Sequence, residues 1–135
     1  MAIRRKKSGE SGFTLMELMI VMLIIGVLMA IAVPNYTSAV KAAKEAVLKE
    51  DLHIMRQAID SYTMDKQKAP QSLQDLVEGG YLKVIPSDPF TRSTESWVTA
   101  QSDSLRSVDQ SDPGIDDVHS GSEQQGSDGQ AYSTW

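Results

Sequence analysis

The sequence GFTLMELMIVMLIIGVLMAIAVP, residues 12–34, decides how this chain is built. From Phe13 to Val33 the stretch is apolar, and Glu17 is its only charged residue. A run of about 20 apolar residues is long enough to cross a bilayer as a helix. A carboxylate inside such a helix is costly unless another group pairs with it. The sequence therefore predicts a membrane helix in which Glu17 has a dedicated partner.

The residues around this run predict its orientation and its processing. The positive-inside tendency keeps a basic N-terminus in the cytoplasm and sends everything after Pro34 across the membrane; the basic residues are Arg4, Arg5, Lys6 and Lys7. The run is longer than the roughly 7 to 15 residues of a secretory signal, and no A-x-A-like site follows it. Cleavage after Gly12 would leave the helix attached to a mature chain that starts at Phe13.

Residues 12–18, GFTLMEL, with Ile24-Ile25-Gly26 and Ala32-Val33-Pro34, resemble the class III signal of type IV pilins and type II secretion pseudopilins. In that family a prepilin peptidase cleaves after the glycine and methylates the new terminal phenylalanine. The resemblance thus implies cleavage between Gly12 and Phe13 and N-methylation of Phe13. It also implies that Glu17 pairs with the charged amine of a neighbouring subunit during filament assembly. The alternative is that Glu17 reaches the headgroups or favours the helix dipole.

Length and composition predict one small domain beyond the membrane helix. We expect a cleaved cytoplasmic leader at 1–12, a transmembrane and filament-core helix at 13–34, and a periplasmic pilin-like domain at 35–135. The 135 residues include no cysteine and only 6% aromatics, so the core must be modest and held by a metal or by oligomer packing. Removing the leader changes the net charge from −5 to −8, which argues against nucleic-acid binding.

A second helical segment follows from Asn35 to about Met64, without glycine or proline. We expect one apolar face to pack on a sheet, rather than on a coiled-coil partner; its residues are Val40, Ala43, Val47, Asp51, Ile54, Ala58 and Tyr62, widened by Leu48, Leu52, Met55 and Ile59. Charged pairs four residues apart predict an exposed opposite side; they are Lys41–Glu45, Glu45–Lys49 and Arg56–Asp60. Joined to the membrane helix, this segment would make one helix of about 75 Å, with a bend or local melting at Met29–Pro34.

The remaining elements predict an α+β fold of the type IV pilin kind. Ser72 and Asp75 form a capping-box pattern before a short helix that ends at Glu78, and Tyr81-Leu82 should pack back on the long helix. Residues 86–90, PSDPF, indicate a rigid turn. Three segments have the character of strands: Trp97–Gln101, Leu105–Asp109 and Ile115–His119. We expect a small C-terminal antiparallel sheet packed against the long helix.

The acidic C-terminal region resembles the calcium loop of major pseudopilins, a glycine-rich segment closed by a tryptophan. The resemblance favours a pseudopilin over a type IV pilin, which usually closes this region with a disulfide. Calcium takes carboxylate, hydroxyl and carbonyl oxygens, and the candidate ligands are Asp117, Gly121, Ser122, Glu123 and Asp128. The sequence has Gln124 and Gln125 where relatives often have Asp-Gly. The alternative is a solvated acidic loop without a metal.

Catalytic patterns are weak, and we predict no enzyme. His53 falls on the long helix, and His119 and Ser120 are neighbours on a strand, where they would point to opposite faces. The sequence predicts a major pseudopilin that polymerises from the bacterial inner membrane into a periplasmic filament to drive type II secretion. Its implied partners are copies of itself, the prepilin peptidase, the assembly platform and minor pseudopilins. The alternatives are a surface type IV pilin, for adhesion, motility or DNA uptake, and a membrane-anchored binding module that never assembles.

Overall fold

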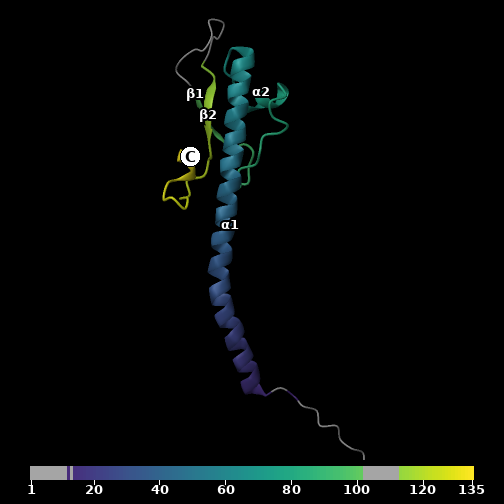
Figure 1. Ribbon diagram of the computed structural model, residues 1–135, viewed down its shortest axis with the longest axis vertical. Helices are drawn as coiled ribbons and strands as arrows, with labels where there is room; N and C mark the ends of the chain where they lie inside the picture. The colour runs from purple at the N-terminus through teal and green to yellow at the C-terminus, as the bar shows by residue number, and fades with distance from the viewer. Residues whose placement is uncertain (1–11, 13, 102–112) are drawn as a thin grey trace, which may run out of the picture. The chain divides into compact units, whose positions relative to one another are not determined.

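The structure is a computed structural model that describes Gly12, residues 14–101 and residues 113–135 (Figure 1). Its elements, in chain order, are α1 (Leu15–Lys66), α2 (Leu73–Glu78), β1 (Val98–Gln101), β2 (Ile115–His119) and the short 3-10 helix η1 (Tyr132–Thr134). Contacts group the chain into two compact units, Met1–Ala39 and Val40–Trp135. The expected α+β class is confirmed, while the boundaries after residues 12 and 34 stay predictions.

Helix α1 is continuous over 52 residues and contains Pro34 in its interior. All residues from Met29 to Pro34 are helical, so the local melting that we expected as an alternative to a bend does not occur. Proline removes only its own N–H donor from the helix ladder, and the bonds on either side remain. The Thr37 hydroxyl also donates to the Pro34 carbonyl at 3.0 Å.

The core of the second unit lies on one face of α1. Leu48, Leu52, Met55 and Ile59 are buried there, and they pack in one cluster with residues of the other elements, namely Leu76, Leu82, Trp97, Ile115, Val118 and Tyr132. The predicted centre of the apolar face is wrong, because Val47 and Ile54 are 50% and 41% exposed. At 3.6 residues per turn, these two positions are rotated by about 100° from Leu48 and Met55. The sheet and loops cover only the Leu48 side.

The segment after α1 forms as predicted. The Ser72 side chain accepts from the Asp75 N–H at 3.3 Å, and the Asp75 carboxylate accepts from the Ser72 N–H at 3.1 Å, which completes the capping box of α2. Tyr81 meets Tyr62 of α1 edge-on, with ring centroids 5.4 Å apart. Leu82 enters the buried cluster. The turn after α2 therefore fastens this segment to α1.

Strands β1 and β2 pair antiparallel, with Val98 opposite His119 and Thr99 opposite Val118. The register shifts between Ala100 and Gln101, as at a β-bulge. Two of the three predicted strands are thus confirmed; Leu105–Asp109 falls outside the described residues. Strand β2 lies beside the C-terminal half of α1 (Figure 1), and its residues Ile115 and Val118 reach the core.

Candidate functional site

The predicted assembly site lies in the first turn of α1. Thr14 caps this helix, because its hydroxyl accepts from the Glu17 N–H at 3.1 Å and its carbonyl accepts from the Leu18 N–H at 3.2 Å. Glu17 is exposed and stands in the acidic first turn, which the helix dipole favours. Gly12 is also exposed, and a Cβ added there would meet nothing within 4 Å. Phe13 lies outside the described residues.

Apolar side chains surround this first turn and the helix that follows. From Leu15 to Val33 the large hydrophobic residues are 44% to 76% exposed. The apolar part of α1 is long and hydrophobic enough to cross a membrane, and none of it is buried. Large exposed apolar patches are uncommon on soluble monomers. The surface is therefore suited to contact with lipid or with other protein.

The five candidate calcium ligands are engaged elsewhere or face solvent. Asp117 accepts from the Arg56 guanidinium at 2.6 Å, and this ion pair takes up one of its two oxygens. Burial acts to raise the pKa of Asp117, but the hydrogen bonds from Arg56 and from the Val118 N–H, with the Arg56 charge, outweigh it and lower that pKa. Gly121 lies against the backbone carbonyl of Ser96.

The other three candidates are in local hydrogen bonds or face solvent. Ser122 is buried, and its hydroxyl accepts from the Gln124 N–H at 3.3 Å. Glu123 is exposed, and Asp128 accepts from the Gln130 N–H at 3.0 Å. In the part of the chain that the structure describes, no three Asp, Glu, His or Cys residues form a metal-binding group. Calcium binding stays a prediction, and the contacts of these residues do not support it.

Two charged residues of α1 hold the C-terminal region, and both were predicted on the exposed side of the helix. Glu45 is buried and accepts from Ser127 and Tyr132. Arg56 binds Asp117, and it also donates to the carbonyls of Val118 at 3.0 Å and Trp135 at 2.7 Å. Neither residue forms a salt bridge with its predicted helical partner, although the nearby charge of Lys41 helps to lower the pKa of Glu45. The sequence does contain a signal for the burial of Glu45. Glu45 lies three residues before Leu48, so a helix places both side chains on the same face.

Asp88 is a second buried carboxylate, which the sequence indicated only as part of a turn. Its side chain is fully buried and accepts from the Phe90 N–H at 2.8 Å and from the Ser120 hydroxyl at 2.5 Å. The Ser120 oxygen in turn accepts from the Ser122 N–H at 3.1 Å. Asp88 thus joins the 86–90 turn to the segment after β2.

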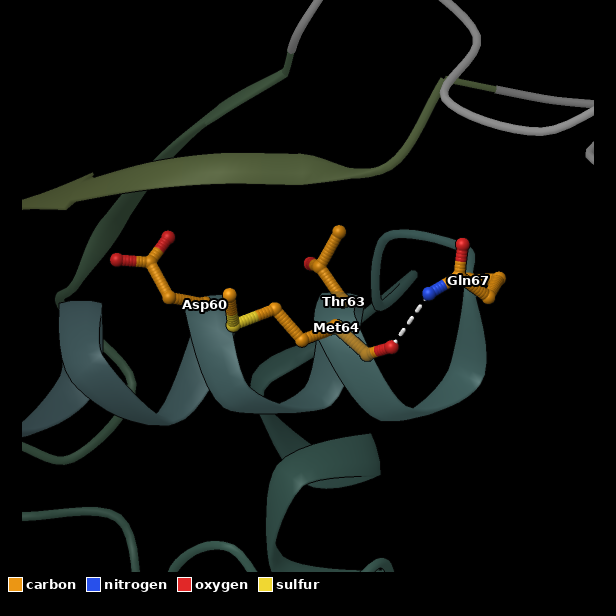
Figure 2. Close-up of a pocket in the computed structure, with 4 residues that line it drawn as sticks. All are labelled: Asp60, Thr63, Met64 and Gln67. Atoms are coloured by element: carbon orange, nitrogen blue, oxygen red, sulfur yellow. Dashed lines mark hydrogen bonds between the residues drawn. The ribbon is translucent and has the colours of Figure 1, made fainter.

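The histidines and the open pocket at the end of α1 offer no catalytic arrangement within the described residues. His119 Nδ1 lies 2.6 Å from the Trp135 carbonyl oxygen, whereas Ser120 faces Asp88, so these neighbours point apart. Asp60, Thr63, Met64 and Gln67 line an open pocket of about 460 Å³. Figure 2 shows these four side chains at the end of α1. Gln67 donates to the Met64 carbonyl at 2.6 Å, and Thr63 donates to the Ile59 carbonyl. Both side chains therefore donate hydrogen bonds to backbone carbonyls near the C-terminal end of α1.

We expect the substitution Gly121→Ala to lower the free energy of unfolding by about 2–4 kcal/mol. The new Cβ would overlap the Ser96 carbonyl oxygen, which is backbone and cannot rotate away. Gly26→Ala is the matched control, since a Cβ there meets nothing within 4 Å. The measurement is denaturant unfolding of the full chain in detergent. Equal stability of the two variants would contradict the predicted contact.

Comparison with known proteins identifies the family. Residues 7–33 match the prokaryotic N-terminal methylation motif. The chain is 37% identical to type II secretion system core protein G of Pseudomonas aeruginosa, over 63% of this chain and 71% of that protein. The proteins of the same name from Aeromonas hydrophila and Escherichia coli are each 33% identical to this chain, over 71% and 70% of their own lengths. The chain belongs to the type II secretion system core protein G family. It is a major pseudopilin.

Relatives of the pilin kind are also present. A type IV major fimbrial protein FimA of Dichelobacter nodosus is 35% identical over 70% of this pseudopilin, but the match covers 58% of that protein. No solved protein structure matches the chain. The predicted pseudopilin family is thus confirmed, and it is a family of structural subunits. The methylation motif spans the segment that contains Gly12, Phe13 and Glu17.

Proposed function

We propose that this pseudopilin polymerises from the inner membrane into a periplasmic filament that drives protein export across the outer membrane. One observation carries the proposal: an exposed apolar helix surface with a single carboxylate, Glu17, in its first turn. The surface suits both lipid and the core of a helical filament. Once water is excluded, the Glu17 carboxylate needs a cation to pair with it. A filament that supplies this cation is therefore favoured over the separate subunit in lipid.

Processing would create that cation. Cleavage between Gly12 and Phe13 frees an α-amine and makes Glu17 the fifth residue of the mature chain. Four residues of helix rise by about 6 Å, so a neighbour displaced along the axis by roughly one turn can bring its amine to this carboxylate. Opposite charges attract strongly where water is excluded, and either one alone is heavily penalised. Pairing therefore favours the assembled subunit over the separate one.

The proposed topology follows from the basic leader and the apolar part of α1. The N-terminus lies in the cytoplasm, a single span crosses the inner membrane, and residues 35–135 lie in the periplasm. The partners are further copies of this chain, the prepilin peptidase, the inner-membrane assembly platform and minor pseudopilins. The chain contributes structure and no chemistry of its own.

Mass spectrometry of the protein from its native membrane tests the processing step. We expect a mature chain that begins at Phe13 and carries one added methyl group. Gly12→Leu is the matched variant, since a bulky side chain at the cleavage position should leave the leader attached. If the native chain still started at Met1, the α-amine of Phe13 would not be free, and the proposed pairing with Glu17 would be contradicted.

The second candidate function is that of a surface type IV pilin, which the similarity to FimA supports. The chain has no cysteine for the disulfide that usually closes the pilin C-terminal region. Deletion of the gene separates the two functions. Loss of secretion with intact twitching supports the pseudopilus, whereas loss of twitching, with filaments outside the cell at native expression, supports the pilus.

A further inference from the structure

Glu45 is a buried carboxylate on the core face of α1. Only 8% of the residue is exposed. It accepts from the Ser127 N–H at 2.9 Å, from the Ser127 hydroxyl at 2.7 Å and from the Tyr132 hydroxyl at 2.7 Å. A buried carboxylate is retained at a reasonable cost only when such donors compensate the lost water. These contacts join α1 to residues more than eighty positions later in the chain.

The loop that supplies these donors is closed by its own backbone. Gly126 N–H donates to the Gln130 carbonyl at 2.7 Å, and Tyr132 N–H donates to the Gln124 carbonyl at 3.0 Å. Between them, Gln125 pairs with Ala131 in an isolated bridge. The loop thus has a defined shape, and several of its carbonyl oxygens already accept hydrogen bonds.

Aromatic packing fixes the Tyr132 hydroxyl in front of Glu45. The Tyr132 ring stacks on Phe90 with centroids 3.9 Å apart and meets Trp135 edge-on at 4.9 Å. Tyr132 is fully buried. Its hydroxyl therefore has little freedom to choose another partner. Lys49, which was expected to pair with Glu45, lies over the Trp135 ring at 4.7 Å instead.

The chemistry of these groups is opposite to that of a cation site. A calcium ion needs six to eight oxygen acceptors, whereas the loop turns hydrogen-bond donors from Ser127 and Tyr132 toward α1. An anion completes such a set, and Glu45 provides it. Asp117, the candidate calcium ligand on β2, is paired with Arg56.

We propose that Glu45 fastens the C-terminal loop to α1 in this chain, in the role that a bound cation would otherwise fill, so that the domain folds stably without calcium. The proposal does not depend on polymerisation, because all of the contacts lie within one subunit. Hydrogen bonds from Ser127, followed by that from Tyr132, lower the pKa of Glu45, with a smaller contribution from Lys41. The carboxylate is accordingly ionised at neutral pH.

Thermal unfolding of the full chain in detergent, followed by circular dichroism, tests the proposal. We expect the natural chain to unfold at the same Tm in millimolar calcium and in chelator, because a site that binds the ion in the folded state would shift Tm. Glu45→Gln should lower Tm by about 5–10 °C in both conditions, since buried donors lose a charged acceptor. Glu50→Gln is the matched control, because Glu50 is an exposed carboxylate on the same helix.

A second variant covers the case in which Glu45→Gln fails to fold. Tyr132→Phe removes one hydroxyl and keeps the stacked ring, so it should lower Tm by a few degrees. In the double variant the two losses should be less than additive, because both remove the same contact. A rise of several degrees in the Tm of the natural chain with calcium would overturn the proposal. So would a Glu45→Gln variant as stable as Glu50→Gln, or strictly additive losses.

Discussion

Replacing Glu17 with Gln is expected to abolish filaments while leaving cleavage and methylation intact. Gln keeps the size of the side chain and its place in the first turn of α1, so only the charge is lost. Breaking a buried ion pair by removing one partner costs about 3–5 kcal/mol, which corresponds to a roughly 150- to 5,000-fold weaker association of each subunit. The concentration of subunit needed for growth should rise by the same factor.

The measurement is the yield of sheared filaments at native expression, with mass spectrometry of the same cells to verify processing. Glu50→Gln, which neutralises an exposed carboxylate in the other half of α1, should assemble at normal yield. Glu17→Asp keeps the charge on a shorter side chain and should fall between the two. Normal filament yield from a processed Glu17→Gln chain would refute the pairing, and Glu17 would then serve only the helix end.

Replacing Asp88 with Ala is expected to lower the free energy of unfolding by about 3 kcal/mol. Asp88 is fully buried, and alanine would leave the Phe90 N–H and the Ser120 hydroxyl without an acceptor. Asp88→Asn keeps one carbonyl oxygen for Phe90, so its loss should be smaller.

Denaturant unfolding, followed by tryptophan fluorescence, measures these losses in the full chain. Trp97 reports on the region directly, because its indole N–H donates to the Pro86 carbonyl at 2.7 Å beside this turn. Glu95→Ala removes an exposed carboxylate from the same loop and should leave stability unchanged. A variant Asp88→Ala as stable as Glu95→Ala would show that the buried network contributes little.

Local signals predicted much of the fold. The apolar run, the capping box at Ser72 and Asp75, and the return of Leu82 to the core depend on residues close in sequence, and all are confirmed. The strands at 98–101 and 115–119 were found although their alternation is weak. The centre of the long helix's apolar face was misplaced toward Val47 and Ile54, because periodicity alone does not say how wide a face the sheet will cover.

The contacts of Glu45 and Arg56 could not be derived in the same way. Their neighbours four residues away suggested surface ion pairs, which contribute only tenths of a kcal/mol. The structure gives both residues partners from the C-terminal segment, 61 to 87 positions away. Tertiary burial thus overrides a weak local preference. Glu45 nevertheless lies in line with Leu48, Leu52 and Met55 along the helix. This position in the sequence indicates that the buried face of α1 ends in a polar residue.

The bare apolar surface of α1 has a consequence for the energetics of growth. Lipid tails and neighbouring apolar helices are similar solvents for such a surface, so moving the helix from one to the other changes the hydrophobic free energy little. In a filament built as proposed, subunits can therefore be stored in the bilayer and move into the filament at little cost in hydrophobic free energy. The same near-balance lets a filament that shortens return its subunits to the membrane intact.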